Sequence, residues 1–344
     1  MSVNLSVLEM WPMVQTSHMS RISARIAAIA ESATLAVDGK AKALKAAGRP
    51  VIGFGAGEPD FPTPDYIVDA AAAATKVVAN HRYTPAPGLP ELREAIVAKT
   101  KRDSNYEITV DQVLVTNGGK QAVYQAFATI IDPGDEVLLP SPYWTTYPEA
   151  IKLAGGKSVE VFADETQNYL VTVEQLEAAR TPKTKALLFC SPSNPTGSVY
   201  NKKELREIAD VVKKYDELYI ISDEIYEHIN FVGGHESMAQ FEDIKDRVIT
   251  INGVSKGFAM TGWRGGIMAA PKWIAQACDK MQGQFTSATC SITQKAMHAA
   301  MDLPSESTSY MRDAFLKRRN LVLDLMKEIP GFKTNIPQGA FYVY

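Results

Sequence analysis

The chain has 344 residues, of which 46% are hydrophobic and 22% charged, and its 36 basic and 39 acidic side chains give a formal net charge of −3. This length exceeds one ordinary hydrophobic core and predicts a large domain with a smaller companion. The near-neutral charge excludes the electrostatic footprint of a nucleic-acid-binding surface or of adhesion to an anionic membrane, so we expect neither partner.

The N-terminal part predicts helices around one short strand. Residues 21–47 have the pattern of a helix interrupted by a loop, and residues 51–55 that of a short apolar strand. A helix is expected over residues 63–78, with threonine as N-cap and Pro64 at the first helical position. Apolar residues on one face predict a further helix over residues 89–100.

Short apolar runs then alternate with helical stretches. Strands are expected at residues 113–115, 136–139, 158–161, 186–189, 218–222, 248–251 and 265–269. Helices are expected between most of them, at residues 120–131, 145–153, 173–179 and 203–215. Short buried strands separated by helices predict an α/β domain in which helices sandwich a mostly parallel seven-stranded sheet.

The last part of the chain predicts a long amphipathic helix over residues 306–329 and the start of a strand at residues 340–344. We therefore expect a large domain over residues 65–308 and a smaller α+β domain built from both chain ends, residues 20–64 and 309–344. Because the chain stops within a predicted strand, the small domain is expected to be incomplete at its C-terminus. Residues 1–19 are expected to be a flexible extension.

The cysteines and the hydropathy of the sequence further narrow the class of protein. The three cysteines, Cys190, Cys278 and Cys290, lack the spacing of a disulfide framework or a structural zinc site. We therefore expect no metal and a reducing, cytoplasmic compartment. No apolar run approaches the ~20 residues of a membrane span. The first residues also lack the basic start and apolar stretch of a secretory signal.

The most informative motif is residues 255–266, which follow the strand expected at 248–251. A lysine in such a loop, Lys256, can be held partly desolvated, so that its ammonium loses a proton more easily. A neutral amine is what Schiff-base formation with an aldehyde requires. Arg264 lies near enough along the loop to bind a phosphate beside it. Each residue alone is more often an ordinary surface group, whereas the combination favours a site.

Polar groups follow two other strands. Asp223 ends one strand and can pair with the protonated nitrogen of a pyridine ring in a bound cofactor, while Tyr226 can donate a hydrogen bond to an oxygen on the same ring. Asn194, framed by Pro192 and Pro195, can hydrogen-bond the same ring oxygen. The alternative is that the aspartate caps a turn and that the asparagine belongs to a proline-bounded turn.

A glycine-containing helix start and one aromatic residue complete the set. Gly119 and Lys120 open a helix, where backbone amides and the helix dipole favour a phosphate, although the GxGxxG dinucleotide spacing is absent. Trp144 can stack on a flat ring, with core packing as the alternative. Because parallel strands end at one edge of a sheet, all these groups are expected to converge.

In combination these motifs resemble the fold-type I pyridoxal-phosphate-dependent aminotransferases of class I and II, most of all the bacterial aspartate and prephenate aminotransferases. The resemblance covers residues 20–344. It implies that Lys256 holds pyridoxal 5′-phosphate as a Schiff base and moves the proton of the substrate α-carbon. It also implies that Asp223 pairs with the ring nitrogen. Tyr226 and Asn194 are implied to contact the ring oxygen, and Trp144 to stack on the ring.

The resemblance also implies how the phosphate is held. The amides of Gly119 and Lys120 would bind it together with Ser255 and Arg264. Tyr83 would reach the phosphate of a neighbouring subunit, which implies a homodimer with shared active sites.

Substrate recognition is implied by a further set of residues. The backbone of Gly57 would meet the substrate α-carboxylate, close to Trp144 and Asn194. Lys120 would bind the distal carboxylate of a dicarboxylic substrate, assisted by Ser32 and Thr34, because a cation and two hydroxyls suit a second carboxylate. The alternative is that Lys120 is solvated and that Ser32 caps a helix.

Two departures from the family pattern stand out. Gly253 occupies a position where many relatives have a phosphate-binding serine. The family's substrate-binding arginine belongs to an Arg-x-Ser strand near the C-terminus, and the chain ends at Tyr344 before such a segment. We therefore expect weak binding of the α-carboxylate, because that arginine supplies a bidentate grip.

The expected activity is pyridoxal-phosphate-dependent transamination. The expected partners are aspartate or glutamate with 2-oxoglutarate or oxaloacetate, and prephenate is a further candidate acceptor. One alternative is another reaction of the same cofactor, such as a C–S lyase or a decarboxylase, which the fold alone does not exclude. The others are a non-catalytic cofactor-binding protein and an inactive fragment.

Overall fold

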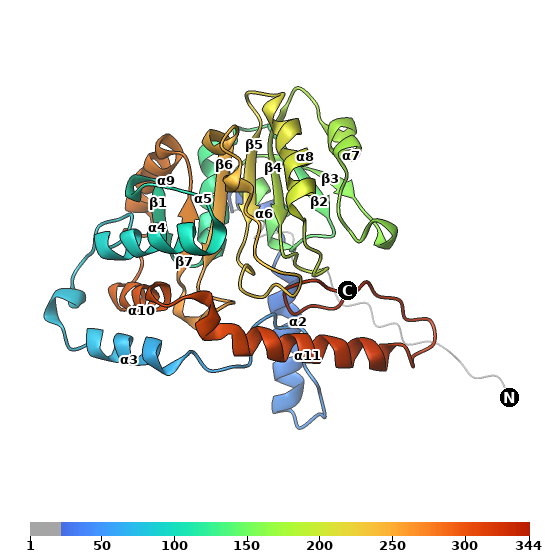
Figure 1. Ribbon diagram of the computed structural model, residues 1–344, viewed down its shortest axis with the longest axis horizontal. Helices are drawn as coiled ribbons and strands as arrows, with labels where there is room; N and C mark the ends of the chain where they lie inside the picture. Colours follow the sequence, from blue (N-terminus) through green and yellow to red (C-terminus); the bar gives the residue numbers. More distant parts are fainter. Residues whose placement is uncertain (1–21) are drawn as a thin grey trace.

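The computed structural model describes residues 22–344, and a seven-stranded sheet forms its centre (Figure 1). The strands are β1 (Val113–Thr116), β2 (Glu136–Ser141), β3 (Lys157–Phe162), β4 (Thr184–Cys190), β5 (Tyr219–Asp223), β6 (Val248–Gly253) and β7 (Gly266–Ala269). Their order is β1-β7-β6-β5-β4-β2-β3. All pairs are parallel except those of β7, which runs antiparallel to both neighbours. The predicted seven-stranded, mostly parallel sheet is confirmed.

The sheet is buried on both faces, as its continuous apolar strands require. Alternate residues of β4 enter two different hydrophobic clusters. Ala186 and Leu188 pack in one cluster with residues of α5 (Gly119–Ile130), α6 (Thr146–Leu153) and α9 (Lys272–Phe285). Leu187 and Phe189 pack in the other with α7 (Val173–Ala179) and α8 (Lys202–Lys213). The α/β sandwich therefore follows from strands whose two faces are both apolar.

Six further α-helices complete the described part of the chain. They are α1 (Ala24–Ala27), α2 (Ala33–Ala46), α3 (Asp65–Ala74), α4 (Pro90–Ser104), α10 (Ser291–Asp302) and α11 (Ser309–Met326). The interrupted first helix and the long last helix are confirmed. Within the described residues, none of the helices is both long and apolar enough to cross a membrane.

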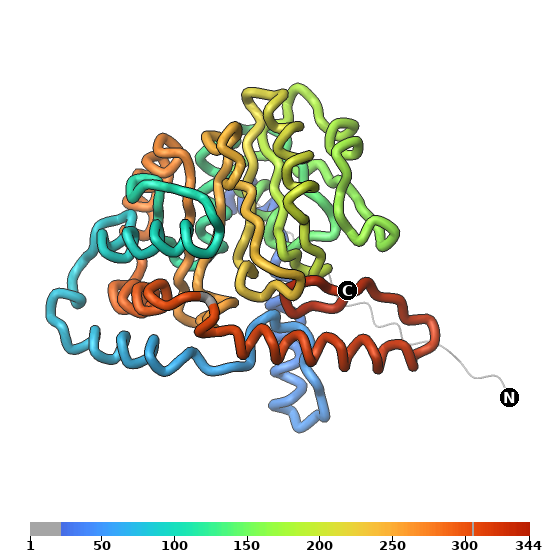
Figure 2. Tube along the Cα trace, viewed as in Figure 1, coloured from blue at the N-terminus to red at the C-terminus, as the bar shows by residue number. Residues whose placement is uncertain are grey.

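The segment after α11 turns back toward the sheet and runs beside loops that follow its strands (Figure 2). Two of its amides, those of Gln338 and Gly339, donate to the carbonyl oxygen of Gly197 at 2.7 and 2.9 Å. The amide of Ala340 donates to the carbonyl of Ile229 at 2.8 Å. These bonds fix the end of the described chain against the carboxyl edge of the sheet.

Three local predictions were wrong. Residues 51–55 form no strand, since Ile52 and Phe54 are 80% and 92% exposed and no neighbouring strand pairs with them. Residues 340–344 form none either, because Ala340 adopts a left-handed φ of 56° and only an isolated bridge forms beside it, at Gly339. Pro64 is the N-cap of α3 and not its first helical residue.

The domain boundaries at residues 65–308, with residues 20–64 and 309–344 as a second unit, stay a prediction. The described parts of the second unit contain helices and no strand. The extension predicted for residues 1–19 lies outside the described residues.

Candidate active site

A cavity of about 990 Å³ lies at the carboxyl edge of the sheet, where the loops after five strands meet both chain-end segments. Twelve of the thirteen predicted site residues line it, namely Ser32, Thr34, Gly57, Gly119, Lys120, Trp144, Asn194, Asp223, Tyr226, Ser255, Lys256 and Arg264. Tyr83 is the exception, with 95% of its surface exposed and no place in the lining. The predicted convergence is therefore observed for every group expected to act within its own chain.

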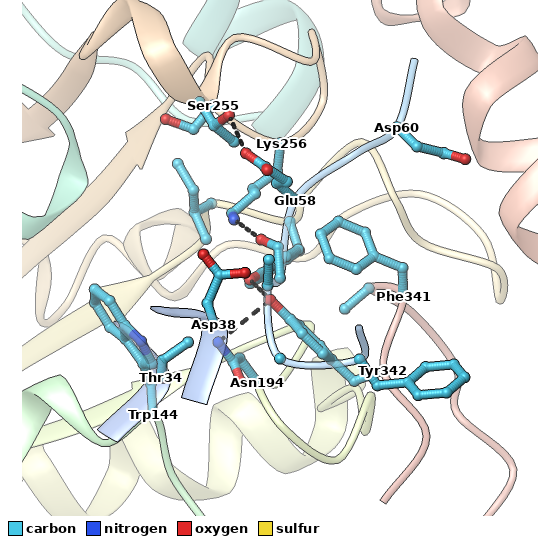
Figure 3. A pocket seen from close by; sticks show the side chains of 18 of the residues that line it. Thr34, Asp38, Glu58, Asp60, Trp144, Asn194, Ser255, Lys256, Phe341 and Tyr342 are labelled. Atoms are coloured by element: carbon cyan, nitrogen blue, oxygen red, sulfur yellow. Dashed lines mark hydrogen bonds between the residues drawn. The ribbon is translucent and has the colours of Figure 1, made fainter. Parts of the chain in front are cut away.

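Lys256 enters the cavity from the loop after β6, and its amine donates a hydrogen bond to the carbonyl oxygen of Gly57 (Figure 3). Burial lowers the pKa of the Lys256 amine to about 8, although the nearby carboxylates of Glu58 and Asp223 oppose this shift. Desolvation disfavours the charged ammonium. About a tenth of this amine is therefore neutral, and nucleophilic, at pH 7.

Asp223, the last residue of β5, is 4% exposed. Its two carboxylate oxygens accept hydrogen bonds from the Tyr147 hydroxyl at 2.7 Å and from the Ile225 amide at 3.2 Å. Burial raises the pKa of Asp223 to about 6, while the Tyr147 hydrogen bond opposes the rise. A buried carboxylate of this kind is stabilised by a cationic partner.

Tyr226 and Asn194, the two groups expected at a ring oxygen, converge on a third residue. The Tyr226 hydroxyl lies 2.6 Å from the Tyr342 hydroxyl, and the Asn194 amide donates to the same oxygen at 3.5 Å (Figure 3). Gly57 makes room for this ring, since a Cβ there would lie 2.5 Å from the Tyr342 hydroxyl. The two predicted ligands thus already share one phenolic oxygen.

Another part of the cavity lining, at Arg264, carries positive charge. Gly118 precedes α5 with a φ of 87°, and a Cβ on it would lie 2.4 Å from Nη2 of Arg264. The Arg264 guanidinium donates to the carbonyls of Thr261 and Asn117 at 2.9 and 3.3 Å and forms no ion pair within residues 22–344. The first amides of α5 precede its hydrogen-bond ladder. An anion is the natural ligand for this arrangement.

Gly253 is explained by its surroundings. A Cβ at this position would lie 2.8 Å from the carbonyl oxygen of Gly265 and 3.1 Å from the Cα of Gly266. A serine would therefore require the neighbouring β7 backbone to move. The phosphate contact that the family resemblance gives to a serine at this position is not available here, which leaves Ser255, 8% exposed and two residues later, as the nearby hydroxyl.

Trp144 and Lys120 lie together in the cavity. The Lys120 ammonium is 5.1 Å from the centre of the Trp144 ring, and burial together with the charge of Arg264 lowers the pKa of Lys120. On α2, Ser32 caps the helix by accepting a hydrogen bond from the Leu35 amide at 3.4 Å. The capping alternative for Ser32 is therefore correct, and its side of the helix also lines the cavity with Thr34.

Several lining residues escaped the sequence analysis, chiefly Asp38, Glu58, Tyr147, Phe341 and Tyr342. Tyr147 follows Trp144 by three residues, and helical spacing signals such neighbours. Tyr342 belongs to an apolar run that resembled a strand, and it meets Tyr226 across 116 residues of sequence. No local pattern signals such a contact.

Comparison with known proteins identifies the family of this chain. The model of the family described as aminotransferase class I and II matches residues 49–344. An aspartate aminotransferase from Streptomyces avermitilis is 56% identical over 94% of this chain and 80% of its own length. An aspartate/prephenate aminotransferase from Cereibacter sphaeroides is 45% identical over 95% of this chain and 82% of its own.

Solved structures are also similar to this chain. The aspartate aminotransferase from Thermus thermophilus with maleate superimposes with a TM-score of 0.90 at 40% identity, and the match covers 94% of this chain and 84% of that one. The fold, the converging site and these relatives together give one conclusion. The chain belongs to the aminotransferase class I and II family.

Proposed function

We propose that this aminotransferase uses pyridoxal 5′-phosphate attached to Lys256 and that it moves amino groups between aspartate and a 2-oxoacid. The observation that carries the proposal is the partly neutral Lys256 amine, whose pKa is lowered to about 8, in one cavity with the buried Asp223 carboxylate. Perturbed titrating groups that converge in a cavity are typical of catalytic sites.

The residues present fit this cofactor. The missing side chain of Gly118 leaves Arg264 close to the N-terminus of α5, which suits a phosphate. Buried Asp223, with its pKa raised to about 6, suits a protonated pyridine nitrogen. The Tyr226 hydroxyl and the Asn194 amide already bind a phenolic oxygen, the same chemical group as the ring oxygen of the cofactor.

Residues of the chain then have separate roles in the reaction. When bound, pyridoxal 5′-phosphate supplies an aldehyde and an electron-withdrawing ring. Lys256 would take the proton from the substrate α-carbon and deliver it to carbon C4′ of the cofactor, which suits an amine with a pKa near the working pH. The Asp223 carboxylate keeps a proton on the ring nitrogen, and Trp144 covers a ring face. The backbone of Gly57 faces the substrate α-carboxylate.

The residues of the cavity and the descriptions of the relatives both support the proposal that the substrates are acidic. Lys120 is a cation in the cavity, whose lining also includes Ser32 and Thr34. Relatives are described as acting on aspartate or on aspartate and prephenate, and the Thermus thermophilus structure is described with maleate, a dicarboxylate. Aspartate or glutamate as donor, with 2-oxoglutarate or oxaloacetate as acceptor, follows from this, and prephenate is a second acceptor to test.

A homodimer with shared sites belongs to the same proposal. Tyr83 is 95% exposed and does not line the cavity of its own chain. The family resemblance implies that Tyr83 binds the cofactor phosphate in the site of a partner subunit. The cytoplasmic location stays a prediction.

The decisive experiment is borohydride reduction of the chain with pyridoxal 5′-phosphate, followed by peptide mass mapping. We expect the label on Lys256, and no label in Lys256→Ala. Beyond one equivalent per active site, oxaloacetate should then form from L-aspartate only when 2-oxoglutarate is present. Label at another lysine would refute the attachment. Repeated turnover of the amino acid without an oxoacid would instead favour a lyase or a decarboxylase.

A further inference from the structure

Tyr147 is a buried residue of α6 that no sequence motif assigned to the site. Its side chain is 1% exposed and its hydroxyl lies 2.7 Å from Oδ2 of Asp223. Burial and the Asp223 charge raise the pKa of Tyr147 well above its usual range, so the hydroxyl keeps its proton and is the donor. This hydrogen bond is therefore directed from the tyrosine to the carboxylate.

The same side chain also contacts Trp144. The two rings pack edge to face, with centroids 5.4 Å apart and an interplanar angle of 88°. Tyr147 thus connects the carboxylate expected at the ring nitrogen with the indole expected over the ring face. One buried residue can set the positions of both, because its amide also donates to the Trp144 carbonyl at 3.0 Å.

The carboxylate of Asp223 has two anchors. Oδ2 accepts from Tyr147 and Oδ1 accepts from the Ile225 amide at 3.2 Å. Each carboxylate oxygen has a second lone pair, so both anchors leave capacity for a further donor. A hydrogen bond to the ionised form also favours ionisation, which a carboxylate buried on all sides needs.

We propose that Tyr147 is a positioning residue that orients the Asp223 carboxylate toward the ring nitrogen of the cofactor and keeps it ionised. This inference rests on the proposed function. It adds a buried group that acts through Asp223 and Trp144.

The test replaces Tyr147 by phenylalanine, which keeps the ring against Trp144 and removes only the hydroxyl. The dissociation constant for pyridoxal 5′-phosphate is expected to rise about ten-fold, the size of one hydrogen bond to a charged group. With ¹⁵N-labelled cofactor, the ring nitrogen should be protonated in the wild type and less so in Tyr147→Phe. Tyr143→Phe is the matched control, because Tyr143 lies four residues earlier and donates to Glu160 instead.

Two further variants separate positioning from packing. In an Asp223→Asn background, Tyr147→Phe should change the dissociation constant less than about two-fold, because coupled residues are not additive. Tyr147→His retains a ring N–H donor, so its ring-nitrogen protonation should lie between those of the wild type and Tyr147→Phe. If Tyr147→Phe does not fold, Tyr147→His can still be compared with the wild type. If Tyr147 acts only by packing, the smaller histidine should restore no more ring-nitrogen protonation than phenylalanine does.

The outcomes are distinct. Wild-type affinity and a fully protonated ring nitrogen in Tyr147→Phe would overturn the role of Tyr147 while leaving the proposed function intact. An equal loss with and without the Asp223 carboxylate would do the same. A wild-type chain that never binds the cofactor at Lys256 would overturn the proposed function itself.

Discussion

The two sides of the cavity are built differently. The sheet side is formed by groups such as Asp223 and Tyr226, which are 4% and 2% exposed and follow buried strands. The chain-end side is formed by α2, which has no buried residue, and by a segment in which Phe54 is 92% exposed. Few buried apolar contacts mean low local stability. The sheet side is therefore pre-organised, whereas α2 and residues 51–55 on the chain-end side are held by few buried apolar contacts.

The strongest test of the sheet side is Gly118→Ala. Its Cβ would lie 2.4 Å from Arg264, so the guanidinium must leave its place, and we expect cofactor affinity to fall about 10–100-fold, as for loss of one or more charge-assisted hydrogen bonds. Fluorescence titration with pyridoxal 5′-phosphate measures the loss. Gly134→Ala is the control, since Gly134 also has a positive φ, 97°, but nothing within 4 Å of a Cβ. Equal effects in both variants would make backbone strain the cause.

The lysine can be tested by pH. Because the pKa of Lys256 is lowered to about 8, its neutral fraction rises with pH up to that value and then levels. The rate of covalent attachment of pyridoxal 5′-phosphate should therefore rise about ten-fold per pH unit below about pH 8 and flatten above it. Stopped-flow absorbance follows the reaction. A rate that keeps rising to pH 10 would show an amine with an ordinary pKa.

Lys120→Met tests whether Lys120 recognises the second carboxylate of the substrate. Loss of the cation should lower kcat/KM for aspartate about ten-fold, as expected for one charge-assisted hydrogen bond, with unchanged cofactor affinity. Activity toward alanine, which lacks a second carboxylate, should not fall. Lys42→Met is the control, because Lys42 also lines the cavity but pairs with Asp38 at 2.7 Å. A parallel loss with both substrates would remove Lys120 from distal-carboxylate recognition.

The smallest effect is expected on the chain-end side. Tyr342→Phe leaves the buried Tyr226 hydroxyl without its 2.6 Å partner and should lower the free energy of unfolding of the cofactor-free chain by about 1 kcal/mol. Urea denaturation measures this change. Bound cofactor should reduce the difference, since its ring oxygen would replace the lost partner. Tyr344→Phe, at an exposed position, should have no effect.

Sequence reasoning succeeded where the determinant is local. An apolar strand followed by a polar residue identifies both the strand and the edge to which the residue belongs, so Lys256, Asp223 and Asn194 were all placed correctly in the cavity. It failed where tertiary neighbours decide. The apolar residues 51–55 had no strand to pair with, and Tyr342 reaches Tyr226 only through the folded chain end.

The hydrogen bond between Lys256 and Gly57 closes a loop of 199 residues, and the Tyr226–Tyr342 contact closes one of 116. Contacts between such distant positions carry a large loop-closure entropy and form late in folding. A growing chain on the ribosome therefore carries the Lys256 amine before the pocket around it is finished. Capture of pyridoxal 5′-phosphate is expected only after residues 338–342 have been synthesised and have docked on the loops of the sheet.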